Sequence, residues 1–356
     1  MIRATVFLPS ALGVLMLIDW LTIRVSYDSL NDDALKVVLA YGDRVQRIDA
    51  KTGELRWETA AWDSIRSDTH AISVKAGGSE LWIQGSPARI IAQGDAVFGS
   101  GASQALDISG CIERMTAFVG SMLGVSLPDP SPWIVSRADI TENLRLADHA
   151  QVRQALSILR DCEGGRYRVS QQAGDTVYWG GKSKHRRGKA YAKGPHLTHI
   201  MKKPDYSGYP YTPEQISDAH QLLRLELTLA REWFSRNDWK TVTPAHLKSE
   251  WDDYFGRMIG GAEMKTETDL KQKVMAAATT EGQGRAAIGC WALIQSQGWE
   301  SAREMQSRTT WYRNLKILRA AGLGDADLSR GQIVQLRRRV MECQTVTSWE
   351  QLARSA

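Results

Sequence analysis

The stretch GGKSKHRRGKAYAKG, residues 180 to 194, places Tyr191 among basic residues. From residue 182 to 203 the chain carries eight Lys or Arg and no Asp or Glu. A tyrosine hydroxyl attacks phosphorus well only when its proton is lost or shared and the phosphate charge is neutralised. On a strand, Lys189 and Lys193 would point the same way as Tyr191 and supply that neutralisation. A tyrosine near lysines is common on basic surfaces, so the local pattern by itself favours a solvated loop over a nucleophile.

Two acidic residues in strand-like stretches could bind a cation. Asp139 in VSRADIT and Glu226 in LLRLELTLA each lie in mid-strand on the more polar face, two residues after an Arg. Mg²⁺ and Mn²⁺ prefer carboxylate oxygens and need only one or two from the protein when a phosphate completes the shell. Asp95, in QGDAVFG, is a possible third ligand. The alternative is a pair of surface salt bridges, which contribute little to stability.

Histidines lie on both sides of the tyrosine in sequence. His185 belongs to the basic stretch, and His196 and His199 form an H-x-x-H pair just after Tyr191. The pair lacks the glutamate of a zinc protease motif. We interpret it as surface residues, with a secondary site as the alternative.

Composition sets broad limits. The 356 residues are enough for about two to three domains. The net charge of +5 suits a nucleic-acid partner without requiring one. The four cysteines show no zinc spacing and predict buried thiols of a cytoplasmic protein.

Residues 4 to 18 are apolar, but they are short for a membrane span and no cleavage site follows. We expect the folded domain to begin near Met16, with a weak signal or anchor as the alternative.

Strands should position most of these residues. Alternating apolar side chains and Gly turns favour strands and hairpins through much of the first two thirds of the chain. Residues 222–230 alternate strictly, although one helix through 213–234 is the competing prediction. Together these patterns predict an α+β domain, a sheet with inserted helices. The predicted strands and hairpins are 19–27, 36–58, 71–85, 133–141, the hairpin of 166–171 with 175–179, and 222–230, and helices are predicted at 104–123 and 147–161.

The chain turns helical after about residue 240. The segment SRTTWYRNLKILRAAGL begins with a Ser/Thr cap and stops at Gly322. A helix, a short helix, a turn and this last helix outline a helix-turn-helix, which lays the start of its last helix in the DNA major groove. A small helical bundle with an exposed basic face fits equally well. The predicted readers of DNA are Thr309, Thr310, Tyr312 and Arg313.

Several stretches, taken in order, resemble the gene II replication initiators of filamentous phages, which start rolling-circle replication. They extend over residues 17 to 240, and TTWYRNLKILRAAGL fits more loosely. The resemblance implies the fold of nicking and relaxase-type initiators, an antiparallel sheet that carries the metal and the tyrosine, with helices behind it. The stretches are LIDWLTIRV, GSPARIIAQGDAVFGS, VSRADIT, TVYWGGKSKHRRGKAYAKG and LLRLELTLAREWF.

The resemblance also implies roles for individual residues. Tyr191 falls on the nucleophile of the family. The family's Gly-His-Asn is Gly94-Asp95-Ala96 here, so Asp95 would have to replace a histidine. The residues expected to act in catalysis are Tyr191, Lys193 and Lys189. Those expected to bind Mg²⁺ or Mn²⁺ are Asp139, Glu226 and Asp95. Those expected to contact DNA are His185, Arg186 and Arg187.

We therefore expect a metal-dependent strand transferase that binds a double-stranded origin, forms a 5′-phosphotyrosine, religates the strand and holds single-stranded DNA. The family implies a host helicase, a single-strand binding protein and a polymerase as partners, and no membrane. The alternatives are a non-catalytic helix-turn-helix regulator and a plasmid mobilisation relaxase. The expected organisation is an N-terminal extension at 1–16, a nicking domain at 17–240, a helical connector at 241–280 and a helical DNA-binding domain at 281–356.

Overall fold

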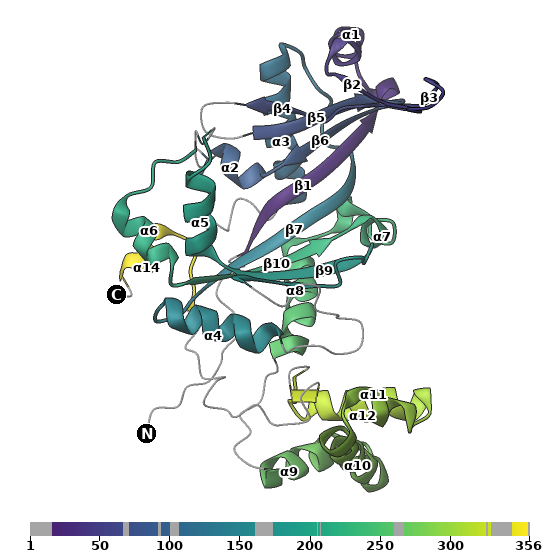
Figure 1. The fold of residues 1–356 in the computed structure, drawn as a ribbon, viewed down its shortest axis with the longest axis vertical. Helices are drawn as coiled ribbons and strands as arrows, with labels where there is room; N and C mark the ends of the chain where they lie inside the picture. Colours follow the sequence, from purple (N-terminus) through teal and green to yellow (C-terminus); the bar gives the residue numbers. More distant parts are fainter. Residues whose placement is uncertain are drawn as a thin grey trace.

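A computed structural model shows one large antiparallel sheet with helices packed on it and a separate group of helices (Figure 1). This confirms the predicted fold class, α+β with a C-terminal all-α part. The structure describes residues 16–66, 71–91, 94–99, 107–160, 174–204, 206, 208–259, 267–324, 327–328 and 344–354.

The strands of the main sheet run in the order β4-β5-β6-β1-β7-β10-β9-β8, and β11 pairs with the end of β7. The longest strands, β1 and β7, lie side by side near its middle. The strands are β1 (Leu17–Ser26), β4 (Asp63–Arg66), β5 (Ala71–Gly77), β6 (Glu80–Gly85), β7 (Ile134–Arg145), β8 (Thr176–Trp179), β9 (Arg186–Ala192), β10 (Leu222–Leu229) and β11 (Gln344–Thr345).

The helices divide between the two sides of this sheet and the separate group. Those that pack on the sheet or beside it are α1 (Asp32–Ala40), α2 (Pro87–Ile91), α3 (Ile108–Leu123), α4 (His149–Arg160), α5 (Lys193–Met201), α6 (Pro213–Ala219), α7 (Arg231–Phe234), α8 (Pro244–Ile259) and α14 (Trp349–Arg354). The separate group is α9 (Glu267–Ala277), α10 (Glu281–Gln297), α11 (Trp299–Glu304) and α12 (Arg308–Ala320).

Strand alternation explains why the sheet has one apolar and one polar face. On β10, Leu223, Leu225 and Leu227 are buried in the main core, which also contains side chains of α3, α4 and α8. Arg224 and Glu226 point to the other face. The strand prediction for residues 222–230 is therefore confirmed over the competing helix. The polar face of β10 is the one that carries the site described below.

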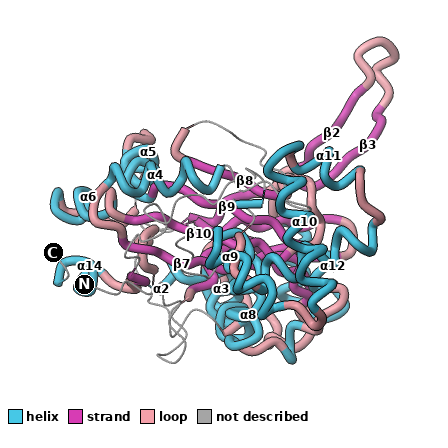
Figure 2. Tube along the Cα trace, turned by 90° about the horizontal axis from the view of Figure 1, so that it is seen from below, coloured by secondary structure: helices cyan, strands magenta, loops and turns pink. Residues whose placement is uncertain are grey.

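Residues 36–40, predicted as strand, instead form the end of α1. Asn31 caps this helix, because its side chain accepts a hydrogen bond from the Ala34 N–H, and two aspartates follow in the first turn. The rest of that stretch forms the predicted hairpin, β2 (Arg44–Ile48) and β3 (Leu55–Ala60). This two-stranded ribbon is separate from the main sheet and projects from the body of the molecule (Figure 2).

The predicted domain boundaries need correction at both ends of the helical part. Helix α8 packs into the main core through Leu247, Trp251 and Phe255, so it belongs to the sheet domain rather than to a connector. Helices α9 to α12 share a core of their own. After them, β11 pairs with β7 and α14 packs beside α6 (Figure 1). Residues 344–354 therefore complete the sheet domain, and the helical unit is an insertion within it.

Other expectations are met in part. Cys111 and Cys290 are buried free thiols, as predicted, while Cys162 and Cys343 lie outside the described residues. The predicted extension, up to residue 15, and the predicted strand at 166–171 also lie outside them. Among the described helices, none combines the length and apolar character that crossing a membrane requires.

Candidate active site

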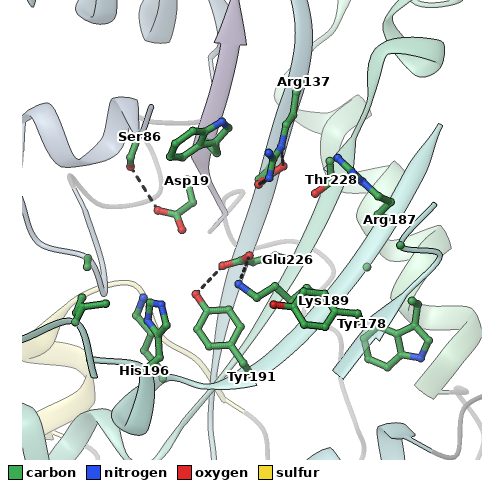
Figure 3. Close-up of a pocket in the computed structure, with 18 of the residues that line it drawn as sticks. Asp19, Ser86, Arg137, Tyr178, Arg187, Lys189, Tyr191, His196, Glu226 and Thr228 are labelled. Carbon is green, nitrogen blue, oxygen red and sulfur yellow. Dashed lines mark hydrogen bonds and ion pairs between the residues drawn. The ribbon is translucent and has the colours of Figure 1, made fainter. Parts of the chain in front are cut away.

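A cavity of about 610 Å³ opens on the polar face of the sheet (Figure 3). Cross-strand pairing assembles it, because residues opposite one another in register share a face. Glu226 of β10 lies opposite Lys189 of β9, and Arg224 lies opposite Tyr191. On the other side of β10, Thr228 lies opposite Asp139 of β7. The antiparallel register thus brings into one cavity residues that are far apart in sequence.

Tyr191 is the centre of this arrangement. Its hydroxyl donates a hydrogen bond to Oε1 of Glu226 at 2.6 Å. The Nζ of Lys189 lies 3.3 Å from the other oxygen of Glu226 and 4.0 Å from the centroid of the tyrosine ring. In Figure 3, Tyr191 and Lys189 both point toward Glu226. The tyrosine is only 3 % exposed, and burial together with the neighbouring Glu226 raises the pKa of Tyr191 well above its usual value, so the phenol is held in its neutral form.

Lys193 reaches the same cavity from the first residue of α5. Its Nζ lies 5.6 Å from the centroid of the Tyr191 ring. The side chain is 1 % exposed, and burial, followed by the charge of Arg224, lowers the pKa of Lys193 well below its ordinary value. The structure thus brings together Tyr191, Lys189 and Lys193, the three residues predicted for catalysis.

The position of β9 depends on one glycine. A Cβ on Gly188 would lie 2.4 Å from Cε1 of Tyr254 in α8. Only glycine lets the strand lie this close to the helix without displacing the ring. The close approach fixes which residues of β9 face α8 and which face the cavity.

The predicted DNA contacts around β9 separate accordingly. Arg187 lines the cavity. Arg186 faces α8, where its Nη1 lies 2.8 Å from Glu250 and 3.1 Å from Asp253. His185 precedes the strand, is half-buried and is not part of the cavity wall. Of these three predicted contacts, the structure places only Arg187 in the wall of the cavity that holds Tyr191.

The predicted metal ligands do not come together as one set. Asp139 and Glu226 both line the cavity, and burial, opposed by Arg137 and reinforced by the charge of Glu226, raises the pKa of Asp139. Asp95 is not part of the cavity wall. Its carboxylate accepts hydrogen bonds from the Val97 N–H, the Tyr211 hydroxyl and the Trp349 indole N–H.

Cationic side chains occupy the oxygens that a divalent metal would need. Arg137 binds both oxygens of Asp139, at 2.9 and 2.6 Å. Glu226 is held by Tyr191 and Lys189, as described above. Within the described ranges, no group of three or more His, Cys, Asp or Glu is arranged to hold a metal ion. The residues present therefore do not fit a preformed metal site, and the divalent cation stays a prediction from the family resemblance.

Several cavity residues were not predicted to belong to the site, and two of them are ionisable groups close to Tyr191 and Arg224. Asp19 of β1 pairs with Arg224 at 3.0 Å. Burial opposes ionisation of Asp19, but Arg224 and Lys193 outweigh it and lower its pKa. Its place in LIDWL, where a charge interrupts apolar residues, was the available signal.

His196 was interpreted as a surface residue, and this was wrong. It lines the cavity, with its ring 5.0 Å from that of Tyr191. Burial, with Lys193 next, lowers the pKa of His196 to about 3, so its imidazole is neutral. Its Nδ1 is buried and has no hydrogen-bond partner within the described residues. His199, the other half of the pair, is exposed.

The predicted DNA readers lie at the start of α12. Thr309, Tyr312 and Arg313 are exposed, while Trp311 and Leu315 pack into the core of the helical unit. Thr310 is half-buried, and its N–H donates to the capping Ser307 hydroxyl at 3.3 Å. A three-residue turn separates α11 from α12. These positions are compatible with a helix-turn-helix, whose contact with DNA stays a prediction.

Comparison with known proteins identifies the family. The family model for the N-terminal part of the phage replication-associated protein encoded by gene II matches residues 17–253, the continuous part of the sheet domain. The chain is also 22 % identical, over 316 residues, to the replication-associated gene II protein of Salmonella phage IKe, covering 75 % of this chain and 74 % of that protein. A solved rolling circle replication initiator protein from Geobacillus stearothermophilus aligns over 67 % of this chain and 84 % of its own, with 10 % identity and a TM-score of 0.31, too low to support an argument. With two thirds of its length matched by the family model, this chain belongs to the family of gene II-type phage replication-associated proteins, the gene II replication initiators.

Proposed function

We propose that the chain starts rolling-circle replication by cutting and rejoining one DNA strand through Tyr191. One observation carries the proposal: the Tyr191 hydroxyl is bonded to a carboxylate inside a cavity lined by more cations than anions. The cations are Arg89, Arg137, Arg187, Lys189 and Lys193, and the anions are Asp19, Asp139 and Glu226. Such a surplus suits a phosphodiester.

In this mechanism the Tyr191 oxygen attacks the scissile phosphorus, and the 3′ oxygen of the preceding nucleotide leaves and takes a proton from water to become a 3′ hydroxyl. The products are a 5′-phosphotyrosine and a free 3′ end that can prime synthesis. Because the raised pKa keeps the phenol protonated, its proton must be transferred as the new bond forms. Glu226, 2.6 Å away, is placed to accept it.

Lys189 and Arg187 neutralise the charge that develops on the phosphate during attack. Burial lowers the pKa of Lys193, and the negative charge of a bound phosphate favours the charged form of this side chain. Lys189 also contacts Glu226, so it stabilises that carboxylate before the proton arrives. In the reverse step a 3′ hydroxyl attacks the phosphotyrosine, and Glu226 returns the proton to the phenol. The phosphodiester energy is kept in the covalent link, so religation needs no nucleotide cofactor.

The helical unit would supply recognition of the double-stranded origin. In this proposal the first turns of α12 enter the major groove, where Arg313 and the neighbouring hydroxyl side chains meet base edges. Tyr191, in the cavity of the sheet domain, then cuts one strand of the DNA that the helical unit has bound.

The test is a covalent adduct. Purified protein is incubated with supercoiled DNA carrying the candidate origin, with and without Mg²⁺ or Mn²⁺, and the products are separated in SDS. We expect a nicked circle and an SDS-stable adduct from the wild type and from the control Tyr178→Phe, and neither from Tyr191→Phe. Adduct formation by Tyr191→Phe would refute the assignment of the nucleophile. Binding without any adduct from the wild type would favour the non-catalytic regulator.

A further inference from the structure

Two aromatic side chains in the wall of the cavity have no role in the mechanism above. Tyr178 lies on β8, the terminal strand of the sheet, and is 36 % exposed. Trp20 lies on β1 and is half-exposed. Both line the cavity, whose other side chains are mainly charged. Large aromatic surface left open beside cations needs an explanation beyond packing.

Each aromatic ring lies beside a cation of the cavity. Tyr178 is directly opposite Lys189 in register, and the Nζ of Lys189 is 5.9 Å from its ring centroid. The guanidinium of Arg137 lies 5.7 Å from the ring centroid of Trp20. Each pair offers a flat π surface next to a positive charge.

The two rings flank the tyrosine along the direction that crosses the strands. Tyr178 is one strand beyond β9, and Trp20 is three strands away from β9 on the opposite side, through β10 and β7. With neighbouring strands about 4.8 Å apart, β8 and β1 lie about 19 Å from one another across the sheet. In register, Trp20 is level with Asp139, and Tyr178 is level with Lys189 and Glu226. A DNA strand that touches both rings therefore crosses Lys189 and Glu226, and the Tyr191 hydroxyl lies 2.6 Å from Glu226, beside that path.

This combination is the one that holds unpaired nucleic acid. Positive charges follow the backbone, and aromatic rings stack on bases without regard to sequence. Bases within a duplex are stacked on one another and cannot offer their faces to side chains. The cavity therefore discriminates by strandedness as well as by charge.

From these contacts we infer that Tyr178 and Trp20 are stacking platforms for bases on the two sides of the phosphate that faces Tyr191, so that the site takes DNA only after its strands have separated. The inference rests on the proposed function for the identity of that phosphate. The aromatic contacts themselves do not depend on cleavage.

The experiment measures binding in a Tyr191→Phe background, so that no strand is cut. A fluorescent 12-nucleotide oligo(dT), an abasic oligonucleotide of the same length and a 12-base-pair duplex are titrated by anisotropy at fixed salt. Added substitutions are Tyr178→Ala, Tyr178→Phe and Trp20→Ala. The matched control is Trp57→Ala, which removes a 46 % exposed ring from the projecting ribbon.

We expect Tyr178→Ala and Trp20→Ala each to weaken oligo(dT) binding by about 5- to 150-fold. Tyr178→Phe and Trp57→Ala should leave it unchanged. Neither alanine variant should alter binding of the abasic strand or the duplex, which separates lost stacking from a damaged fold. Unchanged oligo(dT) affinity in Tyr178→Ala, or an equal loss on the abasic strand, would overturn the inference. Adduct formation by Tyr191→Phe, measured separately, would instead refute the proposed role of Tyr191 as the nucleophile. The result on base stacking by Tyr178 and Trp20 would not be affected.

Discussion

Replacing Glu226 by Gln tests the proton transfer in the proposed reaction. The substitution keeps the shape of the side chain but removes the acceptor that lies 2.6 Å from the Tyr191 hydroxyl. A positioned general base typically contributes about 10²- to 10⁴-fold to the rate. Even with an ordinary tyrosine pKa near 10, the phenolate fraction at pH 7.5 is only about 0.3 %.

A second effect runs in the opposite direction. The negative charge of Glu226 is one of the causes that raise the pKa of Tyr191, so the substitution lowers that pKa and increases the phenolate fraction. We therefore expect the loss to fall at the lower end of the range, about 100-fold at pH 7.5. Because the variant must use phenolate, its rate should rise about tenfold for each pH unit below the pKa of Tyr191. The wild-type rate should depend on pH less steeply.

The assay is the single-turnover rate of adduct formation between pH 6.5 and 9.5, at saturating protein and fixed ionic strength. Asp139→Asn is the matched control, since it removes a carboxylate of the same cavity that is bonded to Arg137. Its rate should change with pH in the same way as that of the wild type. Wild-type rate and pH dependence in Glu226→Gln would refute the reasoning. A loss that higher Mg²⁺ or Mn²⁺ concentration restores would instead support the metal-ligand role implied by the family.

Four further predictions concern the rest of the chain. Gly188→Ala should destabilise the protein by about 1–3 kcal/mol in chemical denaturation, because the new Cβ meets the ring of Tyr254, whereas Gly289→Ala, with nothing within 4 Å of the new Cβ, should be neutral or stabilising. Arg313→Ala should weaken binding of the double-stranded origin by about 1–3 kcal/mol and leave the adduct rate on a single-stranded oligonucleotide unchanged. Trp349→Ala should lower the melting temperature, since it removes an indole that donates a hydrogen bond to Asp95 and whose ring centroid lies 5.0 Å from that of Phe98. Chelation by EDTA should abolish nicking if the family's metal requirement holds here; full activity in EDTA would contradict it.

Local patterns predicted the parts of this fold that local physics decides. The alternation of apolar and polar residues in β10 separates a core face from a cavity face, and the two-residue spacing of Lys189 and Tyr191 puts both on the cavity face of β9. These features depend on neighbours within a few residues along the strand. They were therefore readable without knowledge of the sheet order.

Most of the misplaced site residues depend on long-range pairing. Asp95 looks like a ligand in sequence, yet its partner Trp349 is 254 residues away and holds it outside the cavity wall. Asp19 and His196 reach the cavity only because β1 and α5 meet the same face. Arg186 and Arg187 look equivalent in composition, but successive side chains on a strand point to opposite faces, so Arg186 faces α8 and Arg187 faces the cavity. No local pattern gives the long-range partners of Asp95, Asp19 and His196.

The insertion of the helical unit has a consequence for how the protein is made. The last strand of the sheet domain, β11, follows the inserted helices in the chain and pairs with β7, which is synthesised far earlier. On a ribosome the sheet domain therefore stays incomplete until the helical unit has been synthesised. A chain that stops before α12 would lose β11 and α14 together with the helix that we propose reads the origin. Removing the helical unit cleanly requires an internal deletion that rejoins α8 to residues 344–354.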